Sequence, residues 1–454
     1  MTASTFTRPT SAAAAWYAVG VLTLAYMIAM VDRIILSLMV EPIQRDLHIN
    51  DTQFGLLHGF AFAVFYALAG IPIARIADVA PRRWVIAAGI AVWSLMTALC
   101  ATARHFTHLL LFRLGVGVGE ASLTPAGMSM LADLFPKSQL ARAIAIYAAG
   151  GTMGTALAYI LGGFMMGLFP AESDVAVPVL GMIRGWQVIF LVLGLPGIVF
   201  SLLALTMREP ARQSVVERSA SSSRALWAFM VEERKTIIPY FTGFSLLFVL
   251  SWGLLSWTPA FLIRRFHEDA STVGYTLGAV KAFAGVIGGV SGGIFTDWLV
   301  RRGRDDAHVV VGLFTAMLLL PATALLAFVS DFGMAVALLS VIIFLGVFWG
   351  SAATTGLQII TPPHLRAQVS AVYIMCANLI GFGIGPMLIG LITDYVYRRP
   401  EAVGLSMATV AGCALPIVII LLAIVRRSFV ASGQRQHIRA GGSIATVAEP
   451  APAG

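Results

Sequence analysis

The chain has 454 residues, of which 58% are hydrophobic and only 11% are charged, and its mean hydropathy is +0.87. A soluble domain carries roughly 25% charged residues, so this composition excludes a water-soluble globular protein and predicts one that is embedded in a lipid bilayer. The formal net charge of +8 does not indicate a nucleic-acid partner, because the basic residues stand between hydrophobic segments and form no continuous patch.

The first half of the chain is predicted to hold a short tail and six membrane spans. Residues 1–15 are rich in Ser, Thr and Ala, and we expect them to be disordered. Crossing a bilayer core takes about 20 apolar residues, and a helix satisfies its own backbone polar groups at that depth. Hydrophobic runs predict helices at about residues 16–40, 52–74, 84–103, 107–133, 141–167 and 186–207. These helices would form an N-terminal bundle over residues 16–207.

A polar linker and a second set of six spans follow. Residues 208–236 are rich in charged residues and serine, which predicts a cytoplasmic linker with a surface helix around Leu226–Met230. Hydrophobic runs then predict helices at about residues 237–263, 272–296, 308–329, 333–360, 367–392 and 403–425. They would form a C-terminal bundle over residues 237–427. Residues 428–454 are rich in Ala, Gly, Ser and Pro, which predicts a disordered tail.

The loops between the spans indicate the topology. Lysine and arginine are more numerous on the side that holds both termini, and this bias predicts that side to be cytoplasmic. One motif occurs twice, as Ala74-x3-Asp78-x3-Arg82-Arg83 after the second helix and Gly293-x3-Asp297-x3-Arg301-Arg302 after the eighth. Copies that are six helices apart on one side imply a parallel repeat. We therefore predict an all-α membrane protein with twelve transmembrane helices in two pseudo-symmetric bundles.

The repeated loop resembles the signature of the major facilitator superfamily, Gly-x3-Asp-Arg-x-Gly-Arg-Arg. Asp78, Arg82 and Arg83 match it, whereas Ala74, Val79 and Pro81 depart from it. Further segments resemble the spinster-type branch of lysolipid and sphingolipid transporters. They are Asp32-Arg33, Arg113-Leu-Gly-Val-Gly-Val-Gly-Glu120-Ala-Ser122, Ala132-Asp133-Leu-Phe135, Gly185-Trp186 and Arg208-Glu209-Pro210. The resemblance spans about residues 16–427 and implies a bacterial member of this branch in the inner membrane.

Five charged residues lie inside the predicted spans, namely Asp32, Arg33, Arg113, Glu120 and Lys281. A charge at a helix centre costs about 2.5–3.5 kcal/mol on insertion scales, so these side chains should face one another or an aqueous cavity. Arg113 and Glu120 are two helical turns apart on one face, at a depth that Asp32 and Arg33 can reach. We hypothesise that Asp32 and Glu120 exchange protons while Arg33 and Arg113 tune their proton affinity. The alternative is a permanently ionised cluster that only fixes helix packing.

Polar and aromatic residues within the spans form a candidate substrate site. Lys281 could hold an anionic group or extend toward the membrane surface. Large aromatic side chains with a few hydrogen-bonding groups suit an amphipathic ligand. The candidate substrate-binding residues are Lys281, His58, Tyr66, Trp252, Trp349, Thr354, Thr355 and Asn378.

Charged residues at the predicted cytoplasmic helix ends are candidates for a gate. The resemblance implies that Asp78 and Asp297 dock against the N-termini of helices eleven and five, where an anion gains roughly 0.3–1 kcal/mol. Asp133, at the cytoplasmic end of the fourth helix, is a natural partner for Arg82 or Arg83. The candidate gating residues are Asp78, Arg82, Arg83, Asp133, Arg142, Asp297, Arg301 and Arg302.

These observations predict a secondary transporter that works by alternating access on an amphipathic lipid-like molecule or an organic anion, with proton coupling or proton regulation. A proton symporter of small carboxylates or sugar acids is the nearest alternative, because the buried arginines would suit it too. An intramembrane lipid enzyme would need clustered histidines, acids, serines or metal ligands, and the eight histidines are scattered. A receptor or scaffold would not require the repeated loop. We expect no cofactor and no bound metal.

Overall fold

Twelve membrane spans make up the chain in the computed structural model, which describes residues 11–170, 173–178, 180–212 and 223–439. Within these residues, eleven helices are long and apolar enough to cross a membrane. The remaining span is the predicted fourth helix, which is divided into α6 (Phe106–Glu120) and α7 (Leu123–Leu134). The predicted helical architecture of twelve spans is thereby confirmed.

The first bundle contains nine further segments, in which η1 is a 3-10 helix and η2 a π-helix. They are α1 (Ala12–Ile34), η1 (Ile35–Met39), α2 (Val40–Leu47), α3 (Asp51–Gly55), η2 (Leu56–Phe60), α4 (Ala61–Val79), α5 (Arg82–Cys100), α8 (Lys137–Leu168) and α9 (Gly185–Leu205).

The second bundle has the same six-span plan, with π-helical segments η3 and η4 and a short 3-10 helix, η5. Its segments are α11 (Arg234–Phe266), α12 (Ala270–Val280), η3 (Lys281–Gly285), α13 (Val286–Arg301), α14 (Ala307–Leu326), α15 (Phe332–Phe348), α16 (Gly350–Ile360), α17 (Arg366–Leu391), η4 (Ile392–Tyr397), η5 (Pro400–Ala402) and α18 (Val403–Arg439).

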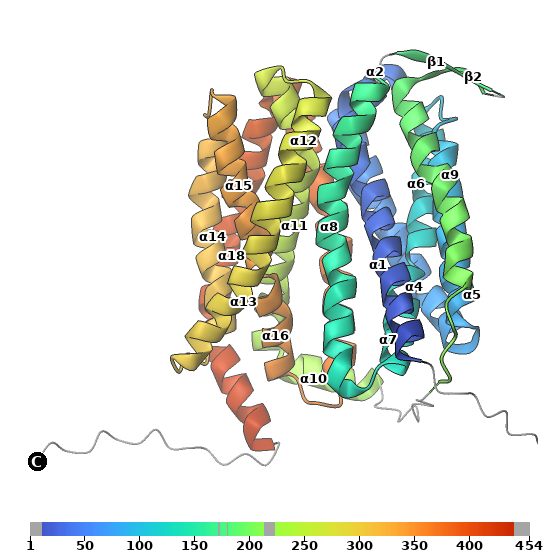
Figure 1. The fold of residues 1–454 in the computed structure, drawn as a ribbon. Helices are drawn as coiled ribbons and strands as arrows, with labels where there is room; N and C mark the ends of the chain where they lie inside the picture. Colours follow the sequence, from blue (N-terminus) through green and yellow to red (C-terminus); the bar gives the residue numbers. More distant parts are fainter. Residues whose placement is uncertain (1–10, 171–172, 179, 213–222, 440–454) are drawn as a thin grey trace, which may run out of the picture.

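Two elements outside the bundles distinguish the ends of the molecule (Figure 1). The helix α10 (Ser223–Glu232) lies across one end, which we call the linker end. The strands β1 (Asp174–Val177) and β2 (Gly181–Arg184) pair as an antiparallel hairpin at the other, which we call the hairpin end. The helix covers the predicted surface helix of the linker, whereas the hairpin was not predicted from the sequence.

The break in the fourth span comes directly after a run of glycines that ends at Gly119. Gly119 lies so close to α5 that an added Cβ would be 2.6 Å from the backbone nitrogen of Trp93. The Ser122 hydroxyl donates a hydrogen bond to the carbonyl oxygen of Gly119 at 2.8 Å. This bond closes a tight turn between α6 and α7, so Glu120 is the last residue of its helix.

The backbones of the two bundles touch on the hairpin side of the molecular centre. A Cβ added at Gly55 would lie 2.7 Å from the carbonyl oxygen of Pro386, and one at Gly59 would lie 2.4 Å from that of Phe382. Only glycine leaves room for such an approach. The bundles are therefore closed against each other at this level.

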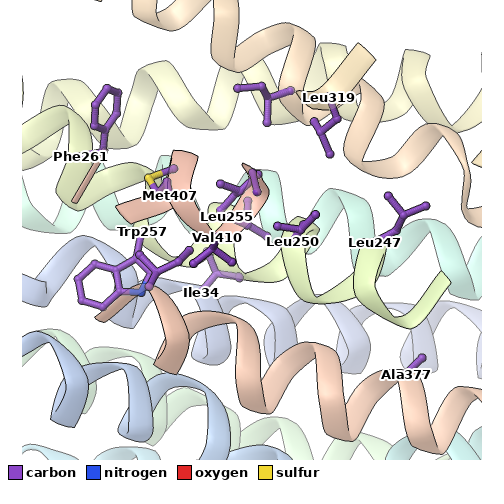
Figure 2. Close-up of a cluster of buried hydrophobic side chains, with 14 of the residues drawn as sticks. Ile34, Leu247, Leu250, Leu255, Trp257, Phe261, Leu319, Ala377, Met407 and Val410 are labelled. Atoms are coloured by element: carbon purple, nitrogen blue, oxygen red, sulfur yellow. The ribbon is translucent and has the colours of Figure 1, made fainter. Parts of the chain in front are cut away.

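The largest apolar core crosses this interface. Figure 2 shows part of it, in which Leu250 and Trp257 of α11 and Met407 of α18 belong to the same buried cluster as Ile34 of α1. The Trp257 indole nitrogen also donates a hydrogen bond to the carbonyl oxygen of Pro386 at 2.8 Å. The core thus joins the first bundle to the second.

The last helix is longer than predicted, because α18 continues to Arg439 instead of ending near residue 425. Glu233 accepts a hydrogen bond from the Ser432 hydroxyl at 2.8 Å and one from Arg435 Nη2, also at 2.8 Å. These bonds anchor the extension, so the prediction of disorder was wrong for residues 428–439. The prediction of a disordered N-terminal tail was likewise wrong for residues 12–15, which form the first turn of α1. Residues 440–454 and residues 1–10 lie outside the described residues.

Candidate functional site

A cavity of about 940 Å³ lies between the two bundles. Ala74, Arg75 and Asp78 line it at the end of α4 and thus place its mouth at the linker end. Arg33 and Phe382 line it at depth. Beyond them, toward the hairpin end, the bundles are in backbone contact at Gly59. The cavity is therefore accessible from the linker end and closed toward the hairpin end.

The four charged residues of helices one and four converge beside the deep end of this cavity. Arg33 Nη2 donates a hydrogen bond to Glu120 Oε2, and the two side chains form a buried ion pair. Arg113 Nη1 donates to the backbone carbonyl oxygen of Asp32 at 3.1 Å. The Asp32 carboxylate accepts a bond from the Thr97 hydroxyl at 3.3 Å. The structure thus brings together the residues that the sequence singled out as a proton-handling group.

Several atoms of this charged group are buried without a hydrogen-bond partner among the described residues. They include Asp32 Oδ1, Glu120 Oε1 and Arg113 Nη2. Each carboxylate therefore has one oxygen that can accept a proton without breaking an existing hydrogen bond. A buried charge that is incompletely satisfied is costly in an apolar medium, and gaining a proton lowers that cost for a carboxylate.

Five of the candidate substrate-binding residues line the cavity, namely Tyr66, Trp252, Lys281, Trp349 and Asn378. Lys281 lies in the π-helical segment η3 and is 8% exposed. Within the part of the chain that the structure describes, no hydrogen bond or ion pair holds its ammonium group. Its charge therefore faces the cavity without a countercharge.

The other three candidates do not line the cavity, which corrects the sequence interpretation. His58 is buried beside Phe54, with ring centroids 6.1 Å apart, in the region sealed by the Gly55 and Gly59 contacts. Thr354 and Thr355 are exposed on α16. At 3.6 residues per turn they lie about 140° and about 120° away from Trp349 around the helix, so they cannot share its face.

At the linker end, Arg82 holds three helix ends of the first bundle together. It contacts Asp133 at the end of α7, and its Nε atom donates to Glu209 Oε1 at 2.8 Å. The other oxygen of Glu209 accepts the backbone N–H of Arg83 at 3.0 Å. The structure therefore places Asp133 beside Arg82, one of its two expected partners, and adds Glu209, which was not among the gating candidates.

The remaining gating candidates occupy the exposed surface of the linker end. Arg142 lies over the ring of Trp16, and Arg302 over that of Trp298. The others, Asp78, Asp297 and Arg301, are exposed. In this conformation the mouth of the cavity is open, and Asp78 is part of its wall.

Asp306 links two spans of the second bundle at the same end. It accepts hydrogen bonds from Arg304 Nε at 3.0 Å and from Arg426 Nε at 2.8 Å. Burial raises the pKa of the Asp306 carboxyl, but these two arginines outweigh burial, and the pKa lies below its ordinary value. The loop before α14 is thus tied to α18 by an ion pair that the sequence analysis did not identify.

A buried cluster around Arg264 closes the hairpin end. Arg264 Nη2 donates to Asp51 Oδ1 at 2.7 Å, and Arg264 Nε donates to Glu41 Oε1 at 2.6 Å. The side chains of Arg264 and Asp51 are only 5% and 3% exposed. A second link runs from Asp394 Oδ2 to the backbone N–H of Thr52, at 2.7 Å. Both links join one bundle to the other, so they form a gate between the bundles.

Sequence analysis missed this gate. Arg264, Glu41 and Asp51 were not among the candidate site residues. The sequence held only a weak signal, because an arginine and two acids at the outer ends of three spans are common there and need not pair with one another. The spacing along the chain could not show which acid it would meet.

Comparisons with known proteins agree with this architecture. A family model described as Major Facilitator Superfamily matches residues 22–386. The chain is 29% identical over 386 residues to an MFS-type efflux pump of Mycolicibacterium smegmatis, covering 84% of this chain and 85% of that protein. It is 25% identical over 420 residues to a probable L-galactonate transporter of Escherichia coli, covering 87% of each.

A solved structure resembles the whole fold. It is the crystal structure of a bacterial homologue of the human lysosomal transporter spinster in an inward-facing and unoccupied conformation. The TM-score is 0.79 at 26% sequence identity, and the match covers 96% of this chain and 100% of that one. The chain therefore belongs to the major facilitator superfamily of membrane transporters and resembles its spinster branch.

Proposed function

We propose that this chain is a proton-coupled secondary transporter that moves an amphipathic, lipid-like organic anion across the membrane by alternating access. The observation that carries this proposal is the position of Arg33. It lines the cavity and is also the ion-pair partner of the buried Glu120. One side chain thereby touches both the space for cargo and a carboxylate that can take up a proton.

Proton coupling is supported by the location of the two acids. Glu120 and Asp32 are buried beside cations inside membrane spans, where ionisable residues commonly mark transport pathways. When Glu120 is protonated, Arg33 loses its countercharge and becomes available to an anion in the cavity. Proton uptake and anion binding would therefore favour each other.

The chemistry of the cavity supports an anionic cargo with an apolar part. Lys281 presents a positive charge that has no ion-pair partner among the described residues, and π-helical turns such as η3 occur frequently at functional sites. The aromatic rings of Trp252 and Trp349 line the same space. A carboxylate or phosphate group would bind near Lys281, while the apolar part of the cargo would contact these rings.

A proton symporter of sugar acids or small carboxylates is the second candidate. It is favoured by the similarity to the probable L-galactonate transporter, whose named cargo is a polyhydroxy carboxylate. The same cations, Arg33 and Lys281, would bind that carboxylate. The two candidates differ in whether the cargo needs an apolar chain.

The excess of basic residues at the linker end supports a cytoplasmic location for that end and for both termini. On this orientation the structure is open to the cytoplasm, and the gate at Arg264 faces the outside. In a bacterium this membrane would be the inner membrane.

The test is flux in proteoliposomes. Radiolabelled lysophosphatidylglycerol and galactonate are each offered with and without an imposed pH gradient, to wild type, Asp32→Asn and Glu120→Gln. We expect the lysolipid to be transported faster with the gradient, and both variants to lose that acceleration. Asp305→Asn, which removes an exposed acid at the linker end, is the control for charge. Transport of galactonate without transport of the lysolipid would favour the second candidate. Equal flux with and without the pH gradient would contradict proton coupling.

A further inference from the structure

Arg33 is held between aromatic rings that come from different bundles. Its guanidinium carbon lies 4.3 Å from the ring centroid of Phe62 on α4 and 4.7 Å from that of Phe382 on α17. The two ring centroids are 6.4 Å apart with an interplanar angle of 64°. A cation over an aromatic face is attracted by the ring, most strongly where water is excluded. Phe382 therefore makes a cation–π contact with Arg33 across the interface between the bundles.

Phe382 is in turn part of an aromatic cluster in the wall of the cavity. Its ring centroid is 4.0 Å from that of Trp252 and 5.7 Å from that of Phe248, and all three residues line the cavity. A continuous chain of contacts thus runs from Glu120 through Arg33 and Phe382 to the cargo space of the second bundle.

We infer that Phe382 is a positioning residue that couples the Arg33–Glu120 pair to the movement of the two bundles. This inference rests on the proposed proton coupling and names the contact that transmits it. Because Phe382 and Glu120 belong to different bundles, a rocking movement that separates the bundles at this level would remove the ring from Arg33. The proton affinity of Glu120 would then differ between the two conformations.

Thermodynamic linkage makes the coupling reciprocal. If the Phe382 ring stabilises Arg33 against the ionised Glu120, then protonation of Glu120 must weaken the contact between the bundles by the same factor. Among the described residues, the other titratable or charged groups around the pair are Asp32 and Tyr26 on α1, His58 and Tyr66 on the second span, and Arg113 on α6. All of these belong to the first bundle, whereas Phe382 reaches Arg33 from the second bundle.

The test reads the protonation of Glu120 directly and needs no substrate. Infrared spectra of the full chain in liposomes are recorded across a pH titration, and the carboxylic-acid C=O band that disappears in Glu120→Gln is followed. Phe382→Leu should shift the midpoint of this band to higher pH by about one unit, a tenfold change, because the cation beside the carboxylate is held less firmly. Phe382→Tyr, which retains a ring, should titrate like wild type.

Phe248→Leu is the matched control, since it removes a ring from the same cluster that does not lie over Arg33. Its midpoint should stay with that of wild type. If Phe382→Leu does not give folded protein, Phe382→Met takes its place, because the flexible methionine side chain adapts to an irregular gap and carries no ring. The inference is overturned if the midpoint of the Glu120 band is unchanged in Phe382→Leu, or if Phe248→Leu shifts it by the same amount. Neither result contradicts proton coupling itself. A wild-type protein without a titrating Glu120 band overturns both.

Discussion

Replacing Arg264 by alanine should open the hairpin end of the cavity. The side chain makes ion pairs with Asp51 and Glu41 and donates further bonds to the side chain of Gln44 and the carbonyl oxygen of Pro400. Removing one partner of a buried ion pair costs about 3–5 kcal/mol, because the other charge stays buried. That cost applies only to the closed arrangement, since water would reach Asp51 once the bundles separate there.

The magnitude is large enough to invert a population. Each 1.4 kcal/mol is tenfold in an equilibrium constant, so the ratio of closed to open molecules should fall by about 100-fold to a few thousand-fold. Conformations of a transporter commonly differ by only a few kcal/mol. We therefore expect Arg264→Ala to spend most of its time open at the hairpin end.

Labelling from outside measures this directly. A cysteine is placed at Thr258, which lines the cavity, in a chain whose three native cysteines are replaced. A membrane-impermeant maleimide is added outside right-side-out vesicles. It should react slowly with the protein that retains Arg264 and rapidly with the Arg264→Ala variant. Arg265→Ala is the matched control, because Arg265 is the next residue and is exposed. Equal labelling rates in the two alanine variants would show that Arg264 does not hold the hairpin end closed.

Three further predictions concern separate parts of the molecule. Lys281→Gln should weaken binding of an anionic cargo by about 10-fold to 100-fold, since a charge-assisted hydrogen bond contributes about 1.5–3 kcal/mol, whereas unchanged affinity by calorimetry would exclude Lys281 from the site. Gly119→Ala should lower the free energy of unfolding by about 1–3 kcal/mol through overpacking, because the added Cβ would meet backbone atoms. Gly20→Ala should leave it unchanged, because nothing lies within 4 Å of a Cβ there, and similar melting temperatures for the two variants would contradict the prediction. Asp306→Asn should lower the apparent melting temperature at neutral pH. The difference from wild type should shrink as the pH falls below about 4, because a carboxyl whose folded pKa is depressed loses its stabilising effect when it is protonated. A difference that stays constant with pH would count against the ion pair.

The charged group in the first bundle could be predicted because burying charge in a membrane is costly. Asp32, Arg33, Arg113 and Glu120 had to meet one another or water, and the helical repeat gave them compatible depths. The pairing itself could not be derived. Arg33 binds Glu120, while Arg113 binds a backbone carbonyl, and this choice depends on helix rotations that periodicity does not determine.

The gate at Arg264 escaped prediction for the opposite physical reason. Charges at the ends of spans cost little, so Arg264, Glu41 and Asp51 looked like ordinary residues near the membrane surface. Arg264 and Asp51 become buried where the two bundles close on each other, which is a property of the conformation. The extension of α18 was missed because its polar composition resembles a disordered segment, although Arg435 finds a buried partner in Glu233.

Helix periodicity bears on which of the candidate substrate residues can face the cavity. Trp349 and Thr354 stand five residues apart, a spacing that places them on different faces, yet both were included as candidates because both are large or polar. His58 shares a stripe with Phe62, but the glycine contacts close the bundles between it and the cavity. Composition identified suitable chemistry, and packing decided which groups reach the cavity.

Proton movement that accompanies the cargo can be measured directly. Proteoliposomes that enclose a pH-sensitive dye are exposed to an inward gradient of lysophosphatidylglycerol with no initial pH difference. Wild type should acidify the interior as the lysolipid enters, and Glu120→Gln should not. Lysolipid entry by wild type without any change in internal pH would contradict the proposed coupling through Arg33 and Glu120.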